Sequence, residues 1–538
     1  MRAHPPLDWT AIPDESVANS YAELILRRAA DGMPASDYAT DWSRVPFSQK
    51  HYLDSPLISL GGPFADRSPD SHEGTSLSRL STLLLFAWGR LSRRLAYNHN
   101  DRATVWERAQ NIRWGRGSAS GGGAYSAALY WVAGPDSGLA AGIYHYSPAH
   151  HALRLLEAGD ATGYVSDIQG YEARASSYVL VTVKYWQNAH KYADFAYQAT
   201  AMDVGTILGT WDYLLRGEGE SVRPDFWVDE LRLATLLGID PRDEGVYAVI
   251  PWGAETTVPA ETWERPPVRV TSADSENAPR IAHFATTNAM QRAMRSLPTR
   301  PSREAFLGVD NPAGRDAEKP GGFPGRVRDP GAAPDAIEAL HRRESSYGRF
   351  NGDAISLDAL LAILLEGASG PDVLGATIRS SDTRSLVRLY VYVLNVDGLE
   401  PGVYVFNADS GSLSLLSAGD HGSFLNSACF LNNYDITQCA AAVVAVANVD
   451  RMCTVAGVRG YRMTSAMVSA CAQKMALEAA GRRVNSGLVL GFDPWRHKTM
   501  LGLGDKEEYP MLMVLIGRDT PESGRWASRI HRGEPIAL

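Results

Sequence analysis

The sequence predicts an α+β protein in which two copies of one domain are fused in tandem. The segment 138–146 recurs as 398–406, and the match continues from 155–160 to 415–420 at a constant offset of 260 residues (138 to 398, 160 to 420). Apolar residues follow helical spacing at 77–87 and 357–365, and they form β-rich runs at 127–133 and 387–394. An offset this long is too large for a solenoid repeat, so the repeated unit is a whole domain.

Each copy begins with an amphipathic helix, at 77–87 and at 357–365, and Ser76 and Ser356 stand at the N-cap positions. A β-rich run follows, and glycines lead it into a second strand as in a hairpin. We then expect a further strand, a long helix, a shorter helix and a closing strand. Helices packed on one mixed sheet make an α+β domain. The expected first strands are 127–133 and 387–394, the further strands 178–184 and 440–446, the long helices 195–215 and 461–480, and the closing strands 245–251 and 511–517.

Composition divides the chain into four parts. Six prolines between 301 and 334 interrupt a stretch rich in glycine and arginine, which cannot keep a helix or a central strand. We therefore expect a linker with one helix near 281–297, and a helix near 18–28 before the first copy. The expected parts are an N-terminal extension (1–70), copy 1 (71–253), the linker (254–335) and copy 2 (336–538).

Charge and cysteine content exclude several classes of function. The net charge of the 538 residues is −9, which argues against a nucleic-acid partner. The four cysteines form no C-x-x-C pair and have no histidines at zinc-finger spacing, so neither a disulfide framework nor a metal site is expected. The N-terminus has no apolar signal core, and no apolar run has the length of a membrane helix. We expect a cytoplasmic protein without a membrane partner.

A basic segment opens the second copy just before its first helix. Clustered guanidiniums and hydroxyls suit a phosphate monoester, because arginine forms bidentate charge-assisted bonds and serine adds a donor. A solvated basic turn is the alternative interpretation. The candidate phosphate ligands are Arg342, Arg343, Ser345 and Arg349.

A glycine-rich segment precedes the first strand of copy 1. Residues 116–124 read Arg-Gly-Ser-Ala-Ser-Gly-Gly-Gly-Ala, and such a segment lets backbone N–H groups approach a flat ring or an anion. It is neither a Walker loop nor a Rossmann fingerprint, because no Gly-Lys-Ser/Thr follows and the strand comes after the glycines. A flexible hairpin is the alternative. In copy 2 the matching positions read Ser380-Ser381-Asp382-Thr383.

These motifs, taken in order, resemble those of the nitroreductase-like flavoproteins. The shared features are R-R-x-S before the first helix of copy 2, S-G-G before a strand, G-L-x-x-G-x-Y and a late L-G-F. The chain looks more narrowly like the SagB-type dehydrogenases, which have a Lys-Tyr pair before the long helix. Lys191-Tyr192 stands at that place, whereas copy 2 has Val455-Ala456, and the segment 41–47 also fits this subfamily.

The resemblance implies two nitroreductase-like domains forming an intramolecular pseudo-dimer with FMN at their interface. A lysine ammonium beside a phenol favours the phenolate, so Lys191 and Tyr192 are the implied catalytic pair. The implied FMN-binding residues are Arg342, Arg343, Ser345, Arg349, Leu490, Gly491 and Arg518 from copy 2 and Ser118, Ser120, Gly121 and Gly122 from copy 1. Because each copy carries only one half of this set, we expect one FMN per chain.

The implied activity is FMN-dependent oxidation of thiazoline or oxazoline rings to thiazole or oxazole in a ribosomally synthesised peptide. The implied partners are the azoline-containing precursor peptide and a cyclodehydratase complex. Two alternatives remain open. One is an NAD(P)H-dependent reductase of nitro or quinone compounds, and the other is a catalytically inactive, peptide-binding partner of a cyclodehydratase.

Overall fold

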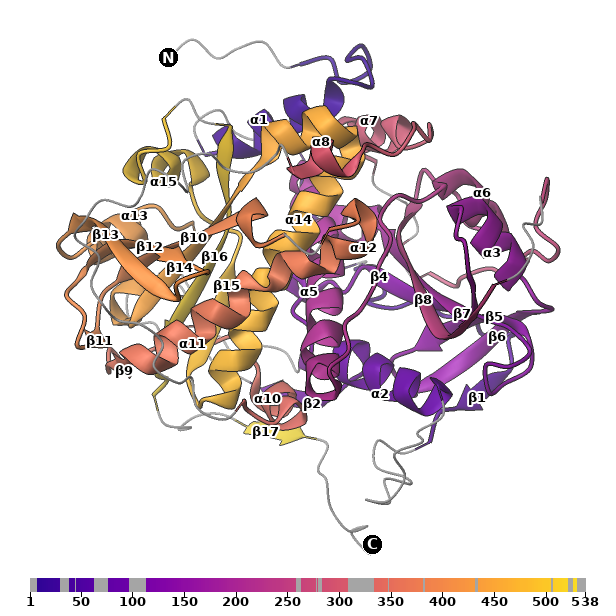
Figure 1. Ribbon diagram of the computed structural model, residues 1–538, viewed down its shortest axis with the longest axis horizontal. Coiled ribbons are helices and arrows are strands. Elements are labelled where there is room, and N and C mark those ends of the chain that lie inside the picture. The colour runs from indigo at the N-terminus through magenta and orange to yellow at the C-terminus, as the bar shows by residue number, and fades with distance from the viewer. Residues whose placement is uncertain are drawn as a thin grey trace, which may run out of the picture.

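In the computed structural model, the two repeated segments form two six-stranded sheets with helices between and around them (Figure 1). The structure describes residues 7–29, 38–43, 45–61, 76–95, 113–257, 263–276, 278, 283–307, 333–346, 348–380, 383–430, 434–504, 507–520 and 526–529. Copy 1 lies on the right of Figure 1 and copy 2 on the left.

The sheet of copy 1 has the strand order β1-β6-β5-β4-β7-β8. Its strands beyond β1 are β4 (Ala127–Ala133), β5 (Gly142–Ser147), β6 (Ala152–Ala158), β7 (Arg174–Lys184) and β8 (Glu244–Thr256). Its helices are α2 (Ser76–Trp88), α3 (Thr162–Gln169), α4 (Tyr185–Tyr192), α5 (Ala196–Leu215) and α6 (Glu230–Leu237).

The sheet of copy 2 has the order β13-β12-β10-β14-β16-β15. Tyr390 pairs with Val405 as Tyr130 pairs with His145, which is the same register displaced by the repeat offset. The strands are β10 (Val387–Val393), β12 (Gly402–Asn407), β13 (Ser412–Ala418), β14 (Ala441–Asn448), β15 (Asn485–Val489) and β16 (Glu508–Gly517). The main helices are α10 (Ala336–Arg342), α11 (Leu357–Ala368), α12 (Gly375–Ile378), α13 (Gly422–Ser427), α14 (Val449–Gly481) and α15 (Pro494–Met500), and the short strands β9 (Ile355–Ser356) and β11 (Val396–Asp397) pair apart from the sheet.

The expectation of a mixed sheet is wrong, because every strand pairing in the two large sheets is antiparallel. Hairpins connect β4 to β5 and β5 to β6. The later strands β7 and β8 follow helices and also pair in antiparallel orientation. The long helix of copy 2, expected at 461–480, lies within α14, which begins at Val449. A turn interrupts α14 at Gly457, whose φ of 56° and ψ of −138° are not helical. The helix of copy 1 at 195–215 is confirmed as α5.

Helices α5 and α14 pack against each other in the middle of the molecule, between the two sheets (Figure 1). Their backbones approach closely, because a Cβ at Gly205 would collide with the Ala466 carbonyl and the Ser469 hydroxyl. One continuous core of buried apolar residues includes side chains from both helices and both sheets. The two copies therefore share a core and form one structural unit.

Segments outside the repeat tie the copies together. Helix α1 (Val17–Arg27) packs on α14, and strand β1 (Leu57–Ser59) adds to the edge of the copy 1 sheet. In the linker, α7 (Ala285–Ala293) packs near α1, and α8 (Arg303–Leu307) near α14. The C-terminal strand β17 (Trp526–Arg529) pairs with β2 (Ser92–Leu95) of copy 1, which also pairs with β3 (Arg113–Gly115).

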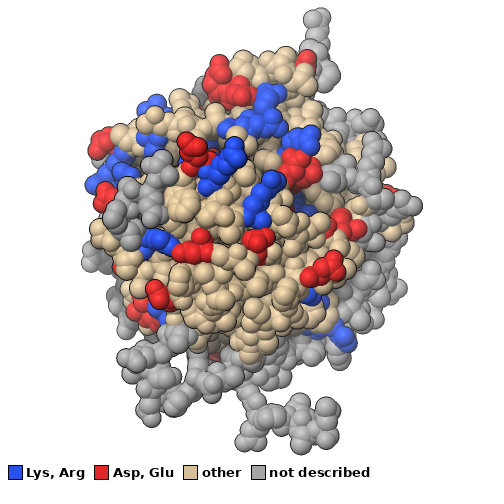
Figure 2. Space-filling model, turned by 90° about the vertical axis from the view of Figure 1, so that its right-hand side faces the viewer, with Lys and Arg blue, Asp and Glu red and all other residues tan. Residues whose placement is uncertain are grey.

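One described segment, Leu357–Ile378, has the length and hydropathy of a membrane-crossing helix. In the structure it comprises α11, a 3₁₀ turn and α12, and 61% of its apolar window is buried inside the protein, mainly against α14. A buried core helix meets the same criteria, so this segment is weak evidence for a membrane span. Figure 2 shows basic and acidic side chains interspersed on the face that copy 1 presents.

Candidate functional site

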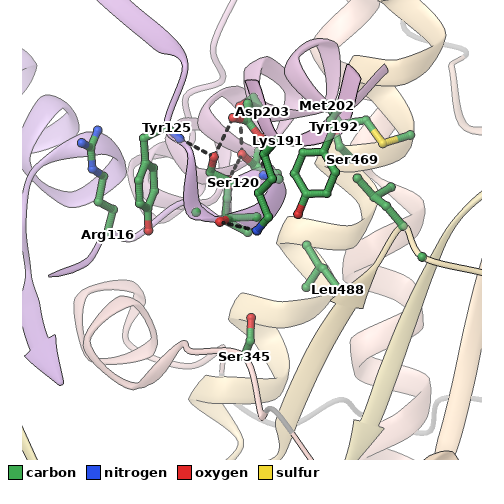
Figure 3. Close-up of a pocket in the computed structure, with 18 of the residues that line it drawn as sticks. Arg116, Ser120, Tyr125, Lys191, Tyr192, Met202, Asp203, Ser345, Ser469 and Leu488 are labelled. Atoms are coloured by element: carbon green, nitrogen blue, oxygen red, sulfur yellow. Dashed lines mark hydrogen bonds between the residues drawn. The ribbon is translucent and has the colours of Figure 1, made fainter. Parts of the chain in front are cut away.

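A cavity of about 900 Å³ lies between the two copies and is lined by residues of both. Copy 1 contributes the glycine-rich loop, the end of α4 and one face of α5. Copy 2 contributes the segment after α10, the end of β15 and Ser469 of α14. Figure 3 shows the loop around Ser120 on one side of this space and Ser345 on the opposite side. The volume lies in the range of small-molecule and cofactor pockets.

The glycine-rich loop turns sharply where it meets the cavity. Gly122 and Gly123 have φ values of 62° and 69°, which glycine adopts without the steric cost of a Cβ. A Cβ at Gly122 would collide with the Tyr192 hydroxyl and lie 2.8 Å from the Lys191 ammonium. The loop therefore needs glycine at position 122 for both its conformation and its contact with the Lys-Tyr pair.

Lys191 and Tyr192 end α4, and the chain turns at Ala193, whose φ is 47° and ψ is −128°. The Lys191 Nζ donates a hydrogen bond to the Gly122 carbonyl at 3.4 Å and lies 4.9 Å from the centroid of the Tyr192 ring. Both side chains line the cavity and lie next to each other in Figure 3. The structure thus brings the two candidate catalytic residues and the glycine-rich loop together.

Copy 2 supplies polar and apolar groups on the other side. Arg343 and Ser345 line the cavity, and Arg343 Nη2 donates to the Arg116 carbonyl at 2.9 Å. Leu490 and Gly491, directly after β15, line it as well. Nine of the thirteen predicted site residues thus line one cavity, namely Lys191, Tyr192, Ser120, Gly121, Gly122, Arg343, Ser345, Leu490 and Gly491.

The other four predicted site residues are not among the residues that line the cavity. Ser118 is fully buried and shares a hydrogen bond with Thr210 at 2.9 Å. Arg342, one residue before the lining arginine, forms an ion pair with Glu338 on its own helix.

Arg349 and Arg518 are held by other partners. Arg349 forms ion pairs with Glu344 at 3.0 Å and with Asp519 at 3.1 Å. The exposed Arg518 donates from Nε to the Ala354 carbonyl at 2.9 Å. Arg343 and Ser345 thus line the cavity, whereas Arg342, Arg349 and Arg518 contact other groups, and Ser118 lies behind the loop. The assignment of all of them to the flavin stays a prediction.

Sequence reasoning missed Arg28, which follows α1 and reaches the cavity from the N-terminal extension. Its guanidinium donates to the carbonyls of Leu490 and Phe492, both at 2.8 Å, and burial lowers its pKa to about 10. Arg28 thereby fixes the backbone of the predicted L-G-F motif. Because the contact joins residues 462 positions apart, nothing in the local sequence indicated it.

Two further lining residues of copy 1 were not predicted. Asp203 on α5 is buried and accepts hydrogen bonds from the loop. The Arg116 guanidinium lies over the rings of Trp88 and Tyr125, 4.8 Å and 4.1 Å from their centroids, and burial lowers its pKa to about 10. The stretch that holds Asp203, 196–215, also holds Asp212, so the sequence alone does not single out Asp203.

The repeat defines a second position related to this cavity by exchange of the two copies. Strand register matches Asp225 in copy 1 to Val489 in copy 2, so Trp227 stands where Gly491 stands in the first site. The Arg459 guanidinium lies 5.3 Å from the centroid of the Trp227 ring and donates to the Val228 carbonyl at 3.2 Å. Large side chains occupy this position among the described residues.

Direct hydrogen bonds also join the copies there. The Thr377 hydroxyl donates to the Pro224 carbonyl at 3.1 Å and accepts from the Phe226 N–H at 3.0 Å. Thr377 is fully buried and lies just before the segment that matches the glycine-rich loop. Among the described residues, side chains and hydrogen bonds of both copies thus meet at the second position.

Comparison with known proteins supports the fold. A protein assigned as a nitroreductase, from Anabaena variabilis, matches with a TM-score of 0.71 at 20% identity, over 94% of this chain and 99% of that chain. The chain therefore has the nitroreductase fold, with two fused domains. No protein-family model matches the sequence, and no curated protein matches it.

Two other solved structures match one part of the chain. A protein assigned as a nitroreductase, from Ralstonia eutropha, is 20% identical with a TM-score of 0.27, covering 38% of this chain and 86% of that chain. The microcin synthetase McbBCD complex from E. coli, solved with truncated pro-MccB17 bound, is 17% identical with a TM-score of 0.29, covering 33% of this chain and 70% of that chain. TM-scores of 0.27 and 0.29 do not establish a shared fold, so the fold assignment rests on the match to the Anabaena variabilis protein.

Proposed function

We propose that this chain is an FMN-dependent dehydrogenase that oxidises thiazoline or oxazoline rings in a ribosomally synthesised peptide. The observation that carries the proposal is the convergence of Lys191 and Tyr192 on the glycine-rich loop, at one wall of a cavity whose other wall holds Arg343 and Ser345. The proposed catalytic pair of copy 1 and the candidate phosphate site of copy 2 thus line the same cavity.

The lining residues fit FMN in shape and chemistry. Gly122 has no side chain, and the loop leaves room where a flat ring would lie, since a Cβ at Gly123 would have no atom within 4 Å. Arg343 and Ser345 supply a charge-assisted fork and a hydroxyl donor suited to a phosphate monoester. Apolar side chains of Met202, Leu488 and Leu490 would contact the isoalloxazine ring.

FMN, when bound, supplies the hydride acceptor and passes the electrons to dioxygen. The protein would bind its phosphate through Arg343 and Ser345 and hold the substrate ring between the flavin and the Lys-Tyr pair. Tyr192 would take the proton from the ring Cα as a phenolate, and the Lys191 ammonium would stabilise that charge. The ring loses a proton to the base and a hydride to the cofactor, a net loss of two hydrogen atoms that leaves an aromatic azole, and the two electrons and two protons would leave as hydrogen peroxide when dioxygen is reduced. The reverse assignment, with a neutral Lys191 as base, uses the same geometry.

The proposal includes an azoline-containing peptide as substrate and a cyclodehydratase complex as its source, because an azoline must form before it can be oxidised. We also propose a cytoplasmic location, where such a complex would act. The aromatic side chains Phe195 and Phe430 line the same cavity and would contact the peptide beside the reacting ring.

Mass spectrometry of an azoline peptide tests the proposed reaction. The purified, FMN-loaded protein is incubated with the peptide in air without NAD(P)H, and each oxidised ring loses one H₂. Unchanged peptide, together with NAD(P)H-dependent reduction of a nitro or quinone compound, would replace this function with the reductase activity. A protein that purifies colourless and binds no added FMN would rule out both flavoenzyme activities.

A further inference from the structure

Asp203 connects α5 to the glycine-rich loop through two hydrogen bonds. Its carboxylate accepts from the Ser120 hydroxyl at 2.7 Å and from the Gly121 N–H at 2.8 Å. The Ser120 oxygen in turn accepts from the Tyr125 N–H at 2.8 Å, so Ser120 links Asp203 to the far end of the turn (Figure 3). Asp203 is 2% exposed and lines the cavity.

The second copy shows that the fold does not require a carboxylate here. Ala193 and Gly457 make the same unusual backbone turn before α5 and within α14, and a tyrosine follows each turn four residues later. Ten residues after the turn, copy 1 has Asp203 and copy 2 has the buried Met467. An apolar side chain therefore fits this helix position, although burying a carboxylate is costly unless it has partners.

We propose that Asp203 is a positioning residue that holds the glycine-rich loop in its flavin-binding shape when ionised and loosens it when protonated. The proposal rests on the proposed FMN site and adds a regulating group to it. A carboxylate accepts both loop donors, whereas a carboxylic acid must donate its own proton. A proton on Oδ2 would be donated to the second lone pair of the Ser120 oxygen, beside the one that accepts from Tyr125, and the Ser120 hydroxyl proton would then lose its acceptor.

Burial places this change near neutral pH. It raises the pKa of Asp203 to about 7, against the lowering effects of the Ser120 and Gly121 hydrogen bonds and of the Arg116 charge. The other ionisable groups that line the cavity are Lys191, Tyr192, Tyr125, Tyr434, Arg28, Arg90, Arg116, Arg343 and Glu344. Because the two loop hydrogen bonds lower the pKa of the buried carboxyl, the carboxylate holds the loop more strongly than the acid does. Above the pKa FMN therefore binds tightly, and below it the loop loosens and binding weakens.

Fluorescence titration of the apo-protein with FMN tests the inference. For the wild type, we expect the Kd to rise about ten-fold between about pH 8 and about pH 6, since a charge-assisted bond is worth about that factor or more. Asp203→Asn should bind FMN more weakly than the wild type at about pH 8 and should show only the pH dependence that the FMN phosphate gives every variant. The FMN phosphate also titrates near pH 6, but it does so equally in every variant.

Two further variants sharpen the test. Asp212→Asn is the matched control, because Asp212 lies on the same helix, pairs with Lys474 and is not among the lining residues, so its pH slope should equal that of the wild type. Ser120→Ala keeps the carboxylate and removes one partner, so it should weaken binding above the pKa even if Asp203→Asn does not fold. An unchanged slope in Asp203→Asn, or in Ser120→Ala an unchanged Kd, overturns this inference alone. A wild type that binds no FMN overturns the proposed function with it.

Discussion

At the scale of single residues, the two copies share packing groups and differ in the residues at the cavity. Tyr197 and Tyr461 match each other, are both buried and both contact the ring of Tyr21. In contrast, Lys191 and Tyr192 are matched by Val455 and Ala456. The proposed catalytic pair is therefore present in one copy alone among these matching positions.

The first prediction concerns the Lys-Tyr pair. Lys191→Ala and Tyr192→Phe should retain FMN but lose azoline oxidation, because they remove proton transfer and not cofactor binding. Loss of a general base costs on the order of 100- to 10,000-fold in rate. Single-turnover flavin reduction by an azoline peptide, followed by absorbance, measures the step directly. If both variants reduce flavin at the wild-type rate, this pair takes no part in proton removal.

The second prediction separates two adjacent arginines. Arg343→Ala should raise the Kd for FMN about ten- to hundred-fold, because a charge-assisted phosphate contact is worth about 1.5–3 kcal/mol. Arg342→Ala, whose guanidinium pairs with Glu338 outside the cavity, should leave the Kd unchanged. Riboflavin, which lacks the phosphate, should bind wild type and Arg343→Ala about equally. Equal FMN affinity in Arg343→Ala would remove Arg343 from the site.

How well the site could be predicted depended on whether a residue acts through a local motif. The glycine-rich loop, the Lys-Tyr pair and Leu490-Gly491 were recognisable because their neighbours in sequence carry the pattern. The ion pair of Arg349 with Asp519, which lies 170 residues away, could not be predicted from local sequence. Arg28 and Asp203 enter the site only through tertiary packing, which spacing along the chain does not reveal.

At the scale of secondary-structure elements, the crossing of α5 and α14 sets the distance between the two walls of the cavity. Gly205 faces Ala466 and Ser469, and Gly209 faces Ala470, so small residues line the contact on both helices. Asp203 and Ser469, on the same two helices, line the cavity. The separation of the helices therefore also positions the groups around the proposed flavin.

The third prediction tests this crossing. Gly205→Ala should lower the free energy of unfolding by about 1–3 kcal/mol, because the added methyl group meets backbone and side-chain atoms of α14 and overpacks the contact. Gly217→Ala is the control, since a Cβ there would have no atom within 4 Å. Urea denaturation of both variants measures the difference. Equal urea midpoints for Gly205→Ala and Gly217→Ala would mean that α5 and α14 accommodate the added methyl group without loss of stability.

The elements themselves were predicted in part. The hairpins, α5 and the closing strands follow from hydrophobic pattern and glycine placement. Strand β6 reads Ala-Leu-Arg-Leu-Leu-Glu-Ala, a composition typical of helices, and forms a strand because β5 and β1 pair with it on either side. The directions of strands outside the hairpins were misjudged, because tertiary packing sets the neighbours of a strand that follows a helix and the hydrophobic pattern of that strand does not.

At the scale of the whole molecule, the structure is a pseudo-dimer with unequal interface sites. One position between the copies is a cavity of about 900 Å³, whereas Trp227, Arg459 and Thr377 lie at its counterpart. The hydrogen bonds of Thr377 to Pro224 and Phe226 join the two copies there. These contacts stabilise the pairing of the two halves.

The fourth prediction is therefore a stoichiometry of one FMN per chain. Heat-released flavin, measured against protein concentration after reconstitution, should approach one per chain and should not increase with excess FMN. The physical reason is that binding at the second position would require breaking buried hydrogen bonds and moving a tryptophan. A ratio near two would mean that the second position also binds FMN. The assignment of a single FMN site shared by the two copies would then have to be given up.

Covalent fusion also changes the effect of a single mutation. In a symmetric homodimer each substitution appears twice, once in every interface site, so the two sites must evolve together. Here positions 203 and 467 occupy matching places but are encoded separately, and one holds an aspartate while the other holds a methionine. A gene of this form can adapt the wall that carries Arg343 to a new substrate without altering the loop that carries Ser120, a freedom that a gene for a homodimer does not have.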